Sequence, residues 1–94
     1  MSTTNIKKLR KAIDALDEKL IGTLNKRTKL AISIGKIKEQ LKESVYSPER
    51  EQQVYNRISK FNKGPLDKKT LRAIYREIMS GTIMLQKPLK QERN

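Results

Sequence analysis

Apolar residues between Ile6 and Leu41 recur at alternating spacings of three and four, which is typical of one long amphipathic helix. The stripe consists of Ile6, Leu9, Ile13, Leu16, Leu20, Thr23, Arg27, Leu30, Ile34, Ile37 and Leu41. No proline interrupts it, and Gly22 and Gly35 each cost a helix only about 1 kcal/mol. We predict a helix over about residues 5–42, capped by Thr4 and ended by the segment 44–48.

A second, shorter helix is predicted over residues 48–61. Ser47 is a suitable N-cap, and Pro48 fits the first helical position, where its missing N–H does no harm. The Asn-Lys-Gly-Pro segment at 62–65 ends the helix. Its stripe consists of Glu51, Val54, Ile58 and Phe61.

The third predicted helix covers residues 67–86, with Asp67 as its cap. Pro88 follows its end, and we expect the basic tail, residues 87–94, to fray. The stripe of this helix consists of Leu71, Ile74, Ile78, Thr82 and Leu85. The chain is therefore predicted to be a single all-α domain over residues 1–94 with three helices.

The length of the first helix bears on assembly. Thirty-eight helical residues span about 57 Å, whereas a compact chain of 94 residues has a diameter of roughly 30 Å. One chain cannot cover such a helix with its own residues. We therefore predict an intertwined homodimer, in which a second copy covers the stripe.

The amino-acid composition excludes several kinds of core, catalytic group and metal site. The chain has 35% hydrophobic and 4% aromatic residues and no Trp, so its core must be aliphatic. It has no Cys and no His, which excludes disulfides, thiolate catalysis and the commonest metal ligand and general base. We expect neither a metal nor a cofactor. No apolar run approaches the roughly 18 residues of a membrane span, and residues 1–5 lack a signal-peptide hydrophobic region, so we expect a cytoplasmic protein without a membrane partner.

The formal net charge of +12 indicates an anionic partner: nucleic acid, an acidic membrane or a small dianion. Lys and Arg are scattered along all three predicted helices without interleaved aromatic residues, so we expect no nucleic acid. A structural coiled-coil adaptor would explain the long stripe but not its polar members.

Each predicted helix carries a polar residue of interest where its stripe calls for an apolar one: Arg27, Glu51 and Thr82. A buried charge without a partner costs several kcal/mol, so these groups must pair with one another or receive a ligand. A structural salt bridge between Arg27 and Glu51 remains the alternative.

Three further residues extend this polar set. Lys38 lies 11 residues after Arg27, only about 20° around the helix, so both cations face one side. Gln86 lies one turn after Thr82. Arg10 lies 17 residues before Arg27 and points about 100° away, but in an antiparallel dimer it could complete the partner's site. The alternative for Arg10 is an ordinary exposed arginine.

These residues lie in motifs that resemble the all-helical chorismate mutases. The first-helix motifs are LRKAID at 9–14, NKR at 25–27 and IGKIK at 34–38. PERE at 48–51 resembles the start of that family's second helix. NKGPL at 62–66 and YREIMS at 75–80 are similar to the mutase domain fused to prephenate dehydratase.

The resemblance implies a Claisen rearrangement of chorismate to prephenate in phenylalanine and tyrosine biosynthesis, at two sites per dimer. It implies that Arg27 binds one substrate carboxylate and Arg10 of the other subunit binds the second. Lys38 would contact a carboxylate and the ether oxygen, and Gln86 would donate to the same oxygen. The reaction transfers no proton and needs no nucleophile, so the lack of His and Cys is no objection.

The resemblance also implies supporting roles around the ring hydroxyl of the substrate. Glu51 would accept a hydrogen bond from this hydroxyl, and Arg50 would steady the polar network around Glu51. Ser47 would act mainly as a cap with a backbone contact to the hydroxyl, and Thr82 would place its own hydroxyl near a carboxylate. Isochorismate pyruvate lyase, of the same fold, is the competing enzyme, although Glu51 and Gln86 together favour the mutase.

Overall fold

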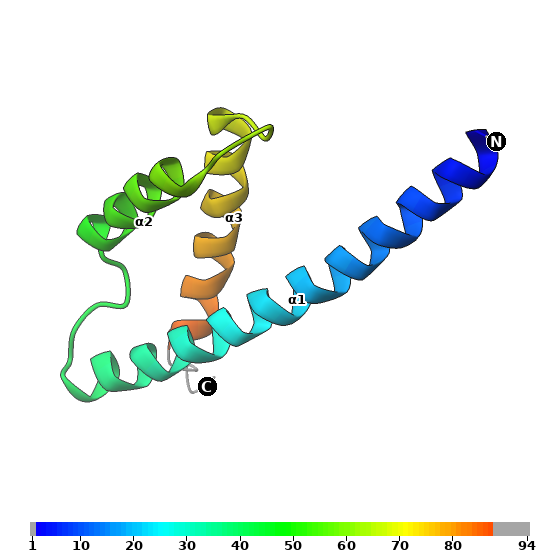
Figure 1. Cartoon of the computed structure of the whole chain (residues 1–94). Coiled ribbons are helices and arrows are strands. Elements are labelled where there is room, and N and C mark those ends of the chain that lie inside the picture. Colours follow the sequence, from blue (N-terminus) through cyan, green and yellow to red (C-terminus); the bar gives the residue numbers. More distant parts are fainter. Residues whose placement is uncertain (1, 88–94) are drawn as a thin grey trace. The chain divides into compact units, whose positions relative to one another are not determined.

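The computed structural model describes residues 2–87, with side chains from residue 5 onward. Its elements are α1 (Ser2–Gln40), α2 (Pro48–Phe61) and α3 (Lys68–Gln86) (Figure 1). Residues 2–87 contain no strand, so the prediction of three helices and an all-α fold is confirmed. Most of the predicted basic tail, residues 88–94, lies outside the described residues. The chain forms two compact units, residues 1–30 and residues 31–94.

The first unit consists of the N-terminal part of α1. The helix begins at Ser2, so Thr4 lies inside its first turn and the prediction of Thr4 as N-cap was wrong. Nothing in residues 2–5 breaks a helix, since neither Gly nor Pro occurs there. The apolar stripe of this unit is exposed, from 45% at Ile6 to 69% at Leu30. The described chain therefore leaves this stripe uncovered.

The C-terminal end of α1 is closed by a Schellman arrangement, in which two backbone N–H groups after the helix bond back to its last turn. The N–H of Lys42 donates to the carbonyl of Glu39 at 3.0 Å, and the N–H of Glu43 donates to the carbonyl of Lys38 at 2.8 Å. Lys42 has a φ of 59°, in the left-handed region that favours glycine. This turn fixes the backbone around Lys38.

Both predicted caps of the later helices are confirmed. The Ser47 hydroxyl oxygen accepts from the backbone N–H of Arg50 at 3.2 Å, at the start of α2. The Asp67 carboxylate accepts from the backbone N–H of Thr70 at 2.7 Å, at the start of α3. Hydrogen bonds from the side chain and then the backbone of Thr70 hold the pKa of Asp67 below its ordinary value. Local side-chain chemistry thus sets where each helix begins.

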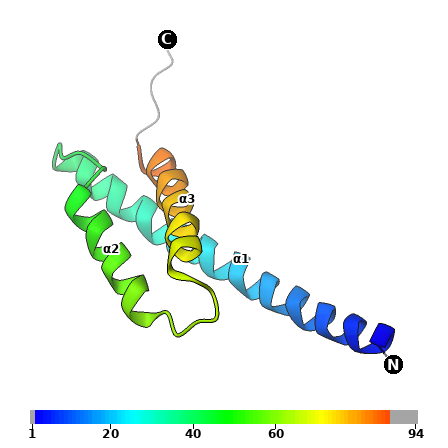
Figure 2. The ribbon, with the colours of Figure 1, turned by 90° about the horizontal axis from the view of Figure 1, so that it is seen from above.

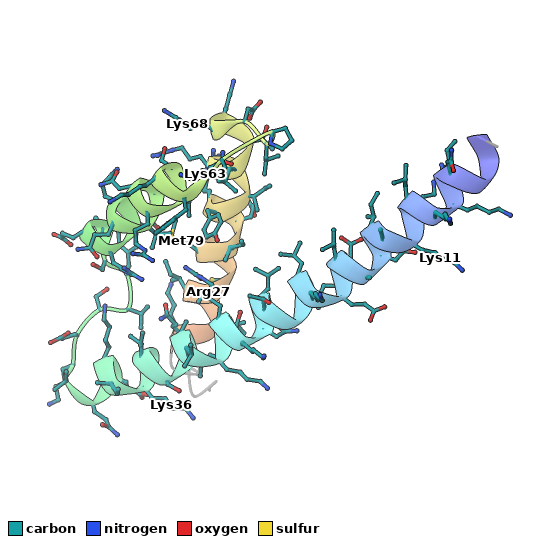
Figure 3. All side chains as sticks on the ribbon, in the orientation of Figure 1. Lys11, Arg27, Lys36, Lys63, Lys68 and Met79 are labelled. Carbon is teal, nitrogen blue, oxygen red and sulfur yellow. The ribbon has the colours of Figure 1, made fainter. Side chains whose placement is uncertain are left out.

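α2 and α3 pack side by side, as both ribbon views show (Figure 1, Figure 2). Val54 of α2 and Met79 of α3 are 6% and 7% exposed, and Thr82 is 7% exposed. Met79 lies on the side of α3 that faces α2 (Figure 3). The guanidinium of Arg72 stacks over the ring of Tyr55 at 3.8 Å and adds a cation–π contact to the pair. This interface is the core of the second unit.

The stripe predicted for the third helix is partly wrong. Thr82 is buried as expected, but Leu85 is 59% exposed and Met79 occupies the core instead. Leu85 and Met79 lie about 60° to either side of Thr82 on a helix. The face toward α2 is centred nearer to Met79, so Leu85 points outward.

The C-terminal end of α3 lies against α1 at Gly35 (Figure 1). Gly35 is buried, and a Cβ atom placed on it would lie 2.7 Å from the carbonyl oxygen of Gln86. On the same part of α1, Ile34 and Ile37 are exposed. Residues 31–40 of α1 thus turn Gly35 toward α3 and leave Ile34 and Ile37 exposed to solvent.

Candidate active site

Lys38 and Glu51 lie at the two ends of the α1–α2 connection. Lys38 is in the last turn of α1 and Glu51 is in the first turn of α2, and both side chains are half-buried. Negatively charged side chains near the start of a helix interact favourably with the positive end of its dipole, and Glu51 lies in that first turn of α2. The two helix ends therefore supply one cation and one anion to the second unit.

Gln86 is the last residue of α3, and its half-buried side chain reaches back to α1. Its amide Nε2 donates a hydrogen bond of 2.8 Å to the carbonyl oxygen of Ala31. An amide group has two N–H donors, so this bond uses only one of them. The second N–H can serve a ligand while the first holds the group in place.

Thr82 is buried one turn before Gln86. Its hydroxyl donates to the carbonyl of Ile78 at 2.7 Å, within α3. The hydroxyl has a single proton, so donation to a substrate carboxylate would require it to turn away from Ile78. The expected role of Thr82 stays a prediction.

Ser47 and Arg50 act within α2. The Ser47 hydroxyl donates to the Glu49 carboxylate at 3.4 Å in addition to capping the helix. The Arg50 guanidinium donates to Oε1 of Gln53 at 3.3 Å, along the surface of α2. A network joining Arg50 to Glu51 stays a prediction.

Arg10 and Arg27 belong to the first unit. Arg10 is exposed, and Arg27, labelled in Figure 3, is half-buried. Six of the eight predicted site residues therefore lie in the second unit, namely Lys38, Ser47, Arg50, Glu51, Thr82 and Gln86. The meeting of the arginines with this set, and the alternative Arg27–Glu51 salt bridge, stay predictions.

Sequence reasoning missed two residues that contact Gln86. Gly35 was treated only as a tolerable interruption of the helix, and Ala31 was not considered. Both are small, and they lie one turn apart on the face of α1 that also carries Lys38. Two small residues four positions apart, on the same helix face as a predicted site lysine, are the sequence pattern from which these contacts could have been predicted.

Within residues 2–87, no group of three or more His, Cys, Asp and Glu side chains is placed to hold a metal ion. Among the helices that the structure describes, none combines the length and apolar character needed to cross a membrane.

The chain is similar in sequence and in fold to known proteins. Residues 9–87 match the chorismate mutase type II family. The bifunctional chorismate mutase/prephenate dehydratase of Aquifex aeolicus is 40% identical over 89 residues, and that of Pseudomonas aeruginosa is 42% identical over 90. Each alignment covers 90% of this chain and 25% of the relative. The chain thus spans about a quarter of the length of these curated relatives.

A solved structure is similar over nearly the whole chain. The chorismate mutase (Form II) of Thermus thermophilus has a TM-score of 0.85 and 26% sequence identity to this protein. The similarity covers 96% of this chain and 99% of that one. The resemblance inferred from the sequence motifs is therefore confirmed, and the chain belongs to the chorismate mutase type II family.

Proposed function

We propose that this chain catalyses the rearrangement of chorismate to prephenate, as a cytoplasmic enzyme of phenylalanine and tyrosine biosynthesis. The observation that carries the proposal is that the family match over residues 9–87 contains all eight candidate site residues, from Arg10 to Gln86. Residues 1–94 act as one domain in this proposal and use no cofactor.

The proposed site has two tasks. It holds a flexible dianion in the compact conformer that brings the bond-forming carbons together, with Arg27 and Arg10 on the two carboxylates. It also stabilises the negative charge that develops on the ether oxygen, through Lys38 and Gln86. The second N–H of the Gln86 amide supports this role, because the bond to Ala31 already orients the group when the ether bond breaks.

The start of α2 would recognise the ring hydroxyl of the substrate. Glu51 accepts from it, Ser47 keeps the helix start in place, and Arg50 balances the charge of the carboxylates there. Thr82 would offer its hydroxyl to a carboxylate from the base of the site. No proton needs to be transferred by any of these groups.

A homodimer completes the proposal. The exposed apolar stripe of α1 supports it, since large exposed apolar surfaces mark interaction sites. A second copy of α1 offers a matching stripe of the same length, and two-fold pairing lets each surface cover its equivalent. Arg10 of one subunit would then contribute to the site of the other.

The primary test is loss of chorismate absorbance with purified protein, with prephenate confirmed by its acid conversion to phenylpyruvate. Turnover is expected for the wild type and should fall at least about 100-fold in Arg27→Ala and Lys38→Ala. The neighbouring exposed lysines provide matched controls, Lys26→Ala and Lys36→Ala, which should retain activity. Release of pyruvate from isochorismate without any turnover of chorismate would overturn the proposal in favour of the lyase.

A further inference from the structure

We propose that Gly35 and the carbonyl of Ala31 together position the Gln86 amide for catalysis. We call these two groups the Gln86 seat. Neither touches the substrate in this proposal, so both are positioning residues that act through Gln86. The inference rests on the proposed mutase function, because it gives Gln86 the ether oxygen as its target.

The seat is built from one turn of α1. The carbonyl of Ala31 accepts a hydrogen bond of 2.8 Å from the Gln86 side-chain amide. Gly35 lies against the backbone of Gln86. Ala31 therefore holds the side chain of Gln86, and Gly35, four residues later, holds its main chain. Fixing both ends of a flexible side chain restricts the rotamers that it can adopt.

Only glycine fits at position 35, because Gln86 lies too close for any residue with a Cβ atom. A Cβ atom there would lie 2.7 Å from the Gln86 carbonyl oxygen, 2.9 Å from its Cβ and 3.0 Å from its Cα. Ordinary contacts begin at 3.4 Å, so the end of α3 would have to move by about 0.7 Å. N–H···O hydrogen bonds occupy a range of only about 0.5 Å. A methyl group at Gly35 is therefore expected to break or misalign the bond to Ala31.

The orientation matters because the amide serves two acceptors. Its first N–H is fixed on Ala31, which sets the plane of the group and the direction of the second N–H. A donor contributes to catalysis when it already points at the position where charge develops. A displaced α3 end would leave Gln86 present but misdirected, so the rate of the chemical step should fall more than substrate affinity.

The experiment is a double-mutant cycle between Gly35→Ala and Gln86→Ala, with kcat and KM measured for chorismate. Gln86→Ala should lower kcat by about 10²–10³-fold, as loss of one preorganised donor does elsewhere. Gly35→Ala should lower kcat about tenfold or more, with KM changed by less than about threefold. In the Gln86→Ala background, Gly35→Ala should cause little further loss. Equal fold-losses in both backgrounds, or no loss in either, would overturn the proposal.

Matched controls are available in the other helical glycines. A Cβ atom at Gly81, in α3, or at Gly22, in α1, would meet nothing within 4 Å. Gly81→Ala and Gly22→Ala should therefore leave kcat within about twofold and stabilise their helices. If Gly35→Ala alone does not fold, the cycle is repeated in the background of these two stabilising substitutions.

A second readout does not depend on turnover. In a ¹H–¹⁵N spectrum, the Gln86 side-chain amide pair is identified by its disappearance in Gln86→Ala. One of its two protons should be protected from solvent exchange in the wild type and lose that protection in Gly35→Ala, but not in Gly81→Ala. A wild type without turnover would refute the proposed function alone, whereas an unprotected Gln86 amide would refute the seat alone.

Discussion

The carbonyl oxygen of Lys38 accepts a hydrogen bond of 2.8 Å from the backbone N–H of Glu43, across a turn in which Lys42 has a φ of 59°. This turn ends α1 at Gln40, two residues after the proposed site residue Lys38. Glycine is the usual residue at the left-handed position because it has no Cβ to clash with the backbone.

Lys42→Gly should therefore stabilise the protein by about 1 kcal/mol, since relief of the left-handed strain outweighs the extra freedom of glycine in the unfolded chain. Thermal unfolding followed by circular dichroism at one fixed protein concentration would measure the gain. Lys42→Ala is the control, because it removes the charge but keeps the Cβ, and it should show no such increase. A loss of stability in the glycine variant would contradict this account of the turn.

Gln86→Glu should convert a pH-insensitive donor into a pH-dependent one. An ionised carboxylate cannot donate to the ether oxygen, whereas the protonated acid has one O–H. The ratio of variant to wild-type kcat should rise as pH falls from about 8 to about 4, because protonation of the acid restores a donor. It should stay below one, because a single O–H must serve both Ala31 and the substrate. A flat ratio across this range would contradict the proposed role of Gln86.

Arg10 can be tested by mixing subunits. If Arg10 acts across the dimer, a mixed dimer of Arg10→Ala and Lys38→Ala subunits contains one intact site and one doubly defective site. Random co-refolding makes about half of the dimers mixed, so about a quarter of wild-type activity should return. If Arg10 acts on its own subunit's site, every site keeps one defect and no activity returns. A Lys11→Ala and Lys38→Ala mixture controls for refolding, with Lys11 the exposed neighbour of Arg10.

Asp67 gives a pH dependence of stability with a defined sign. Its pKa is lowered in the folded chain by the hydrogen bonds from Thr70, so the folded state binds the proton less readily than the unfolded state. The stabilisation is present above the unfolded pKa and is lost as pH falls through the lower, folded pKa.

Asp67→Asn keeps a capping oxygen without a titrating group. The difference in stability between wild type and Asp67→Asn should therefore shrink below about pH 4, in urea denaturation measured at several pH values. A constant difference would mean that Thr70 does not favour the charged form of Asp67. Asp67→Ala, which loses the cap altogether, should be the least stable of the three at neutral pH.

The parts of the fold that the sequence predicted are those that depend on nearby residues. Ser47 and Asp67 each cap the N–H three residues ahead, so their roles can be inferred from a four-residue window. The turn at Lys42 could not be predicted, because lysine is not a residue that favours a left-handed backbone. Likewise, the core position of Met79 depends on how α3 is rotated against α2, and the helical period alone leaves that rotation open.

In the candidate site, too, the features that could be predicted are those that depend on residues close together in sequence. Helical spacing placed Arg27 and Lys38 on one side of a helix from sequence alone. The contact between Gly35 and Gln86 joins segments 51 residues apart in sequence, and no local pattern specifies it. The proposed role of Arg10 requires a second chain, so neither the sequence nor the fold of one chain tests it.

Ionic strength should affect the proposed pairing through the exposed stripe of α1 and the attraction of the substrate in opposite directions. In the proposed dimer, two chains of formal net charge +12 each would come together, and salt would screen the repulsion between them. Apolar contact between the two stripes would not be screened, so salt should favour the proposed pairing. Attraction of a dianion to the same positive charge weakens under the same conditions. The proposed dimer would therefore be most stable at ionic strengths where the chain attracts its proposed substrate least, and activity should be highest between these two limits.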